Sequence, residues 1–142
     1  MAESKYGKYV MTTDLLPVLP PGKQNTSDQW TRLTYLDSSS IKGAFYVECL
    51  WFWKGSDTAL NKAHTHDFDE VITFYGSNPE DPIDLGGEVE LWLGDEKHVF
   101  TKSVLVFVPK GLSHCPLTVR RVDRPIFHFP AGPANIYLKG EG

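Results

Sequence analysis

Short segments in which apolar and polar positions alternate, or in which apolar positions run on, cover most of this chain. In residues 87–94, GEVELWLG, Val89 and Leu91 alternate with Glu88 and Glu90. A period of two residues is typical of a β-strand with one face in the core and the other in solvent. The glycine at the end of this segment, followed by aspartate, predicts a hairpin turn into a second strand.

Eight further segments predict strands, because β-branched and aromatic residues dominate them. Residues 43–53, GAFYVECLWFW, are apolar at nearly every position, which predicts a strand buried on both faces. A single helical turn is expected at residues 56–63. Many short strands with Gly, Pro, Asp and Asn between them predict an all-β antiparallel sandwich or barrel. The eight segments are residues 30–36, 43–53, 70–76, 97–100, 103–109, 117–122, 125–130 and 135–140.

The N-terminal part of the chain differs from the rest. Residues 11–29 hold Pro17, Pro20, Pro21 and Gly22 in close order and show no strand or helix periodicity. They predict an extended arm laid over the barrel or over a partner subunit. With 142 residues the chain fits one domain, so the expected division is an arm at residues 1–29 and a β-barrel domain at residues 30–142.

Composition argues against several classes of partner. The formal net charge is −4, and the densest basic cluster, residues 120–124, is interrupted by Asp123, so no nucleic acid partner is expected. Cys49 and Cys115 match neither a disulfide framework nor a zinc spacing, which favours a reducing compartment. No apolar leader stands at the N-terminus, and the most apolar stretch contains Glu48 and is too short to span a bilayer. A soluble cytoplasmic protein without a membrane partner is therefore expected.

One histidine-rich segment carries candidate chemistry. Residues 62–76, KAHTHDFDEVITFYG, contain His64 and His66, which share one face if this part of the chain is extended. Glu70 can rejoin that face a few residues later. The two aspartates beside the glutamate, Asp67 and Asp69, are expected to occupy the turn and to orient the neighbouring side chains.

A second segment completes the candidate site. In residues 107–116, FVPKGLSHCP, Pro109 and Gly111 end one strand, and His114 opens the next. If the two segments lie on neighbouring strands, three imidazoles and one carboxylate converge. Three neutral nitrogens and one charged oxygen suit a divalent first-row transition metal and leave coordination positions open on a six-coordinate ion. The ion would retain about one net positive charge, which favours an anionic or enolate-like small-molecule substrate.

These two segments resemble the two motifs of the cupin superfamily. The first motif is matched by His64, His66, Glu70 and Gly76, and the second by a Pro-x-Gly-x-x-His sequence that ends at His114. The resemblance spans residues 43–130. It implies a single antiparallel β-barrel of the jelly-roll type and a metal held by the three histidines and the glutamate. Fe or Mn is expected first, and Ni, Zn, Co or Cu would also fit. A homodimer is expected too, because cupins commonly pair through edge strands.

The resemblance implies a mononuclear metal-dependent enzyme. The leading expectation is a dioxygenase that acts on a small organic acid, an enol or a phenolic compound. Two alternatives stay open: a non-redox isomerase, decarboxylase or lyase that uses the same metal, and a non-catalytic cupin that binds a small ligand.

Two further residues are candidates for a catalytic role. His128 alternates with Phe127 and Phe129, so it is expected to face the barrel interior, either as an acid or base near the metal or as a hydrogen-bonded core histidine. Glu48 interrupts an apolar strand, so it is expected either to be exposed at a bulge or to be buried beside a partner. If it is buried near the metal, it could serve as a base. Aromatic residues are abundant, and most are expected in the core, with some lining an apolar pocket above the metal.

Overall fold

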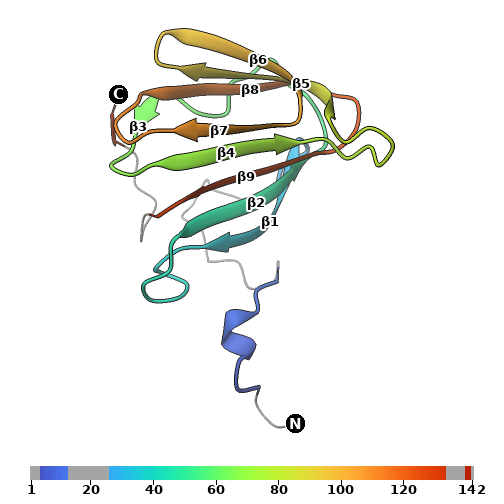
Figure 1. Cartoon of the computed structure of the whole chain (residues 1–142). Helices are drawn as coiled ribbons and strands as arrows, with labels where there is room; N and C mark the ends of the chain where they lie inside the picture. The colour runs from blue at the N-terminus through green and yellow to red at the C-terminus, as the bar shows by residue number, and fades with distance from the viewer. Residues whose placement is uncertain (1–3, 13–25, 134–139, 142) are drawn as a thin grey trace.

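Two antiparallel sheets of five strands each make up the fold, seen in a computed structural model that describes residues 4–12, 26–133 and 140–141 (Figure 1). The first sheet, called sheet I, has the strand order β1-β2-β9-β4-β7. Its strands are β1 (Trp30–Leu36), β2 (Tyr46–Phe52), β9 (Ile126–Gly132), β4 (Glu70–Tyr75) and β7 (Val104–Val108).

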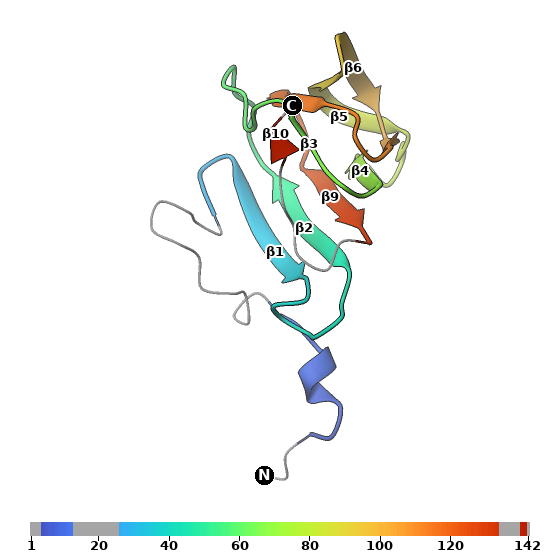
Figure 2. The ribbon, with the colours of Figure 1, turned by 90° about the vertical axis from the view of Figure 1, so that its left-hand side faces the viewer.

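The second sheet, called sheet II, has the order β10-β3-β8-β5-β6. Its strands are β10 (Gly140–Glu141), β3 (His64–Thr65), β8 (His114–Val122), β5 (Asp84–Leu93) and β6 (Glu96–Lys102). A 3-10 turn, η1 (Gly7–Tyr9), precedes sheet I in the chain. After a quarter turn, β1 and β2 are the strands nearest to η1, and β6 lies at the opposite end of the molecule (Figure 2).

This architecture confirms the predicted all-β class of the jelly-roll type. No α-helix occurs in the described part of the chain. The helical turn expected at residues 56–63 is wrong, because this segment runs beside β8 instead. The backbone N–H groups of Ser56 and Leu60 donate to the carbonyl oxygens of Val119 and Leu117, at 2.8 Å in both cases. Hydrogen bonds to a neighbouring strand thus replace those of a helix.

The core lies between the inner faces of the two sheets. In β5, Val89 and Leu91 are fully buried while Glu90 is not, as the alternation in sequence predicts. Phe52, Phe74 and other apolar side chains fill the same layer. Burying side chains of this size contributes about 1.5–3 kcal/mol each, so this layer fixes the distance and register of the two sheets.

Strand β2 departs from the prediction that it is buried on both faces. Tyr46, Leu50 and Phe52 are buried, whereas Trp51 between them is only half-buried. The apolar run in the sequence hides an alternation, because the face of β2 turned away from sheet II is also apolar. Aromatic content alone does not tell a two-sided core strand from a strand with an apolar outer face.

The predicted arm at residues 1–29 is described only in part. Residues 13–25, which contain its prolines, lie outside the described residues, as does most of the strand expected at residues 135–140. Among the residues that are described, no helix combines the length and the apolar character needed to cross a membrane.

Candidate metal centre

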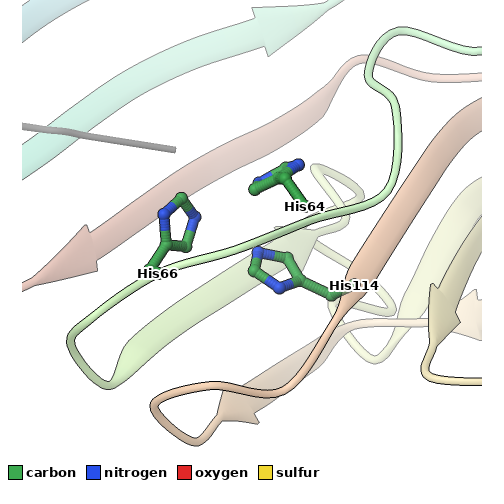
Figure 3. A group of neighbouring side chains, drawn as sticks. All are labelled: His64, His66 and His114. Atoms are coloured by element: carbon green, nitrogen blue, oxygen red, sulfur yellow. The ribbon is translucent and has the colours of Figure 1, made fainter. Parts of the chain in front are cut away.

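Three buried histidines converge where β3 meets β8 in sheet II (Figure 3). His64 in β3 is the register partner of His114, the first residue of β8, and His66 follows just after the end of β3. The ring centroid of His64 lies 4.4 Å from that of His114 and 4.7 Å from that of His66. The centroids of His66 and His114 are 4.9 Å apart. The two sequence segments therefore meet at one place, as their spacing predicts.

Glu70 reaches the same place from sheet I, where it opens β4. Its Oε1 lies 3.4 Å from Nε2 of His66 and 3.2 Å from Nε2 of His114, and its side chain is buried. A buried carboxylate is costly unless positive charge or hydrogen-bond donors compensate it. The contact between Glu70 and the histidines joins the two sheets at this end of the molecule.

Backbone carbonyl groups fix the orientation of two of the three rings. Nδ1 of His64 donates to the carbonyl of Lys62 at 2.7 Å, and Nδ1 of His114 donates to the carbonyl of Leu112 at 3.0 Å. A carbonyl oxygen only accepts, so in a neutral imidazole the proton sits on Nδ1. Nε2 of each ring then carries a lone pair, which is the tautomer that a metal ligand needs.

The environment of His114 calls for a positive charge. Its Nε2 is buried and has no hydrogen-bond partner among the described residues, although Oε1 of Glu70 is 3.2 Å away. Two acceptors at this distance repel each other unless a proton or a cation lies between them. Burial raises the pKa of the Glu70 carboxyl, but the imidazoles of His114 and His66 outweigh burial and hold the pKa below its ordinary value. Glu70 is therefore ionised, and the positive charge opposite it is a proton on an imidazole or a cation in the same place.

A metal ion meets this requirement. One ligand atom from each of His64, His66 and His114 lies within 4.8 Å of the other two. Two ligands on opposite sides of an ion are about 4.2 Å apart, twice a metal–nitrogen bond of about 2.1 Å. The three side chains therefore need only small movements to share one ion.

The loops that carry these ligands are tied to each other. The backbone N–H of Lys110 donates to Oδ1 of Asp69 at 2.8 Å, and the N–H of Gly111 donates to the carbonyl of His66 at 3.0 Å. Gly111 has φ +84°, which favours glycine at this turn. Asp67 is exposed, and its Oδ1 lies 3.6 Å from Nζ of Lys110. Of the two aspartates expected in the turn, Asp69 connects the loops.

Phe68 is a part of the site that sequence reasoning did not single out for a role. Its ring stacks on His66 with centroids 4.7 Å apart and an interplanar angle of 22°. A Cβ at Gly132 would come within 2.7 Å of the Phe68 ring, so glycine is required for the ring to sit there. Only the three-dimensional approach of β9 to this loop reveals the pair.

His128 faces the interior as its alternation predicts, but it packs among apolar rings. Its centroid lies 4.6 Å from Phe74 and 5.6 Å from Phe52, and its Nδ1 donates to the carbonyl of Thr73 at 2.8 Å. Burial lowers the pKa of His128 to about 4, so the ring is neutral at neutral pH. It is not one of the three clustered histidines.

Glu48 lies on the inner face of β2, in the same row as Leu50 and Phe52. Its Oε2 is 3.3 Å from Nη2 of Arg32 on the neighbouring β1, and both side chains are largely buried. The nearby Tyr35 hydroxyl donates to Asp37 at 2.8 Å. Glu48 is thus paired with a cation, rather than standing alone on an exposed bulge.

Comparison with known proteins gives no match from sequence. No family model matches the chain, and no curated protein matches it. Solved structures do resemble it. Oxalate oxidase in complex with the substrate analogue glycolate has a TM-score of 0.54 at 13% identity, with 96% of this chain and 64% of that chain covered.

Two other solved structures have a similar fold. Oxalate decarboxylase from Bacillus subtilis has a TM-score of 0.54 at 12% identity, with 84% of this chain and 29% of that chain covered. FeII HppE has a TM-score of 0.53 at 12% identity, with 87% of this chain and 59% of that chain covered. This chain spans less than two thirds of each of these proteins. At such low identity the likeness concerns the fold, and it confirms the resemblance drawn from the two motifs: the chain has the cupin fold.

Proposed function

We propose that this protein is a mononuclear metal-dependent oxidoreductase of the dioxygenase type. It holds one divalent ion through His64, His66, His114 and Glu70 and acts on a small anionic organic compound. The observation that carries the proposal is the buried Nε2 of His114, which faces the Glu70 carboxylate at 3.2 Å with no hydrogen-bond partner among the described residues. A cation between these two atoms turns repulsion into coordination.

The similar structures support this choice of chemistry. The oxalate oxidase structure contains glycolate, a small organic acid, and the HppE structure contains ferrous iron. Three neutral imidazoles and one carboxylate would leave about one net positive charge on a divalent ion. An anionic substrate with two oxygen donors fits that charge and the open coordination positions.

Each residue has a definite part in this proposal. When bound, the ion would supply Lewis-acid and redox chemistry to the substrate and to O2. His64 and His114 present Nε2 because the carbonyls of Lys62 and Leu112 hold their Nδ1 protons. Glu70 supplies the one negative charge of the ligand set. Water is restricted by the burial of all four side chains.

His128 and Glu48 would take part in proton transfer in this proposal. His128 is neutral near neutral pH, so it can take up a proton more readily than it can release one. Glu48 is balanced by Arg32, and a substrate carboxylate that competed for Arg32 would free Glu48 as a base. Both residues face the space between the sheets.

The first test is metal analysis of protein purified without added metal, by plasma mass spectrometry. We expect about one transition-metal ion per chain, with Fe or Mn leading. Oxygen uptake is then measured with an oxygen electrode against small dicarboxylates, enols, diketones and phenolic acids.

The same substrates are incubated under nitrogen as the matched arm. Product that forms only with O2 supports the dioxygenase proposal. Product that forms equally under nitrogen would replace it with a non-redox isomerase, decarboxylase or lyase. Protein that binds no metal even after incubation with Fe, Mn, Ni, Co, Cu and Zn would overturn both.

A further inference from the structure

An arginine and a glutamate lie on the inner face of sheet I, on the neighbouring strands β1 and β2. Arg32 is the register partner of Leu50, and Tyr35 is the register partner of Glu48. Residues paired in register point to the same side of a sheet, and Leu50 belongs to the core between the sheets. A shift in register between Arg32 and Thr34 lets Tyr35 face the same side. The two charged side chains therefore point toward the interior.

The ion pair that these side chains form stays within reach of solvent. Nη2 of Arg32 lies 3.3 Å from Oε2 of Glu48, and their side chains are 15% and 16% exposed. The residues on either side of Glu48 in the same row, Tyr46 and Leu50, are 3% and 7% exposed. An ion pair in an apolar layer is often no more stable than apolar side chains of the same volume. Stability alone therefore does not account for this pair, and a small solute can approach it.

Aromatic rings continue from Arg32 along the inner face. Cζ of Arg32 lies 5.5 Å from the centre of the Tyr35 ring, within the range of a cation–π contact. Tyr35 meets Tyr46 edge-on, with ring centroids 5.9 Å apart. Burial and the neighbouring Asp37 raise the pKa of Tyr35, so the phenol stays neutral. The guanidinium is thus held against an uncharged ring.

The same row reaches the metal centre. Tyr46 is the register partner of Gly132 in β9, and Phe68 lies against Gly132 and stacks on His66. Strands β2 and β9 separate β1 from β4, the strand that begins with Glu70 (Figure 1). Three strand spacings amount to about 14 Å between backbones, and side chains that point inward narrow the gap. A ligand with one ring between its two ends suits such a separation.

An arginine that already contacts one carboxylate is able to hold another. Arg120 in this chain contacts Oε2 of Glu90 at 3.0 Å and Oδ1 of Asp57 at 3.2 Å at the same time. The planar guanidinium offers five N–H donors in a fixed arrangement. A ligand carboxylate at Arg32 therefore does not require Glu48 to leave.

The other buried carboxylate of this region has its own donors. Asp37 accepts from the Tyr35 hydroxyl and from the backbone N–H of Ser39, at 2.8 Å in both cases. The Ser39 hydroxyl donates to it as well. Its negative charge is therefore stabilised without the guanidinium.

We infer that Arg32 binds the far end of the substrate, and that the substrate is a planar organic acid with two acidic groups at opposite ends. The inference rests on the proposed function, because the metal ion holds the first acidic group. The second group binds the Arg32 guanidinium, and the flat middle of the molecule lies along the rings of Tyr46 and Phe68. An acid with a single carboxylate satisfies only one of the two positive charges.

The test is isothermal titration calorimetry of the zinc-loaded full chain, because zinc supports no redox turnover. Terephthalate has two carboxylates across one ring, and 4-carbamoylbenzoate has a neutral amide in place of the second. We expect terephthalate to bind at least about tenfold more tightly. Arg32→Gln should abolish this preference. Arg120→Gln is the matched control and should retain it, because Arg120 is exposed and its partner Glu90 alternates with core residues of β5.

Glu48→Gln distinguishes a ligand-binding arginine from a structural ion pair. Removing the negative charge beside Arg32 should tighten terephthalate binding several-fold, whereas Arg32→Gln weakens it. A structural pair would give both variants the same direction of change. The double variant Arg32→Gln/Glu48→Gln removes both charges and leaves no unpaired buried charge. It should fold even if Arg32→Gln does not, and it should lack the preference for terephthalate.

Circular dichroism and zinc content are measured on every sample. Three results would overturn the inference: a zinc-loaded wild type without a preference for terephthalate, a folded double variant that keeps the preference, or a Glu48→Gln variant that binds terephthalate more weakly. A wild type that holds no zinc would instead contradict the proposed function. The Arg32 site would then be judged by whether Arg32→Gln weakens terephthalate binding while Arg120→Gln does not.

Discussion

Four buried histidines lie between the two sheets, and they divide into two kinds of environment. Nε2 of His114 faces the Glu70 carboxylate with no hydrogen-bond partner in the described part of the chain, and His64 and His66 adjoin it. His128 is equally buried, but it donates to the carbonyl of Thr73 and packs between aromatic rings. Burial of an imidazole therefore does not identify a metal ligand. The distinguishing feature of the proposed metal ligands is a ring nitrogen close to a buried carboxylate.

Removing a ligand from the cluster is the strongest way to test this distinction. In His66→Ala we expect the metal content to fall from about one ion per chain to a small fraction of that. The loss of one ligand should weaken binding by roughly 3–4 kcal/mol. Plasma mass spectrometry of the purified protein measures the metal content, and a competitive chelator titration measures the affinity.

His98→Ala is the control for that variant. His98 is half-exposed on β6, where its Nε2 lies 3.2 Å from Oε1 of Glu96 and its ring stacks on Phe100. Its metal content should equal that of the wild type. Retention of stoichiometric metal in His66→Ala would end the assignment of this cluster as a metal centre.

His128 should act on stability and not on metal binding. Its folded-state pKa is about 4, below the ordinary 6.5, so the unfolded chain takes up the proton first as the pH falls. Stability from this group is therefore lost between pH 6.5 and about 4, and not further below. The shift corresponds to roughly 3 kcal/mol.

The measurement is urea unfolding of metal-free protein at pH 7 and at pH 4. His128→Gln retains a donor for the Thr73 carbonyl but does not titrate in this range. The difference in unfolding free energy between the two pH values should be smaller in the variant, by up to roughly 3 kcal/mol. An unchanged difference would show that His128 is already protonated or solvated in the folded chain.

Glu70→Gln separates the contribution of the carboxylate to metal binding from the effect of its charge on the stability of the metal-free protein. Removing the negative charge should weaken metal binding about tenfold or more. The glutamine amide can donate to Nε2 of His114, so the metal-free variant should gain about 1 kcal/mol of stability over the metal-free wild type. Thermal unfolding in the presence of a chelator checks the gain. A less stable metal-free variant would mean that a proton already bridges Glu70 and His114.

Asp69→Ala should give the smallest effect. It removes the acceptor for the Lys110 N–H and loosens the connection between the two ligand-bearing loops. We expect a loss of about 1 kcal/mol in stability and a loss of less than about tenfold in metal affinity. Asp67→Ala, at the exposed neighbouring position, should change neither quantity. Equal effects of the two variants would rule out a specific role for Asp69.

The sequence by itself predicted most of the strands that the structure describes and the three histidines that it brings together. Strict alternation in β5 predicted the burial of Val89 and Leu91, and the Pro-x-Gly-x-x-His spacing placed His114 at the start of a strand. These features are local, because the side-chain period of a strand and the turn preferences of proline and glycine act over a few residues.

Only the tertiary structure decided where apolar residues face when both sides of a strand are apolar. Trp51 belongs to a segment that the sequence predicts to be buried on both faces, yet it lies on the outer side of sheet I. The pairing of His64 with His114 and the approach of Glu70 from the other sheet were likewise decided there. Both depend on strand order and on packing across the core, which bring together residues about 50 positions apart, and a pattern with a period of two residues holds no information about such distant partners.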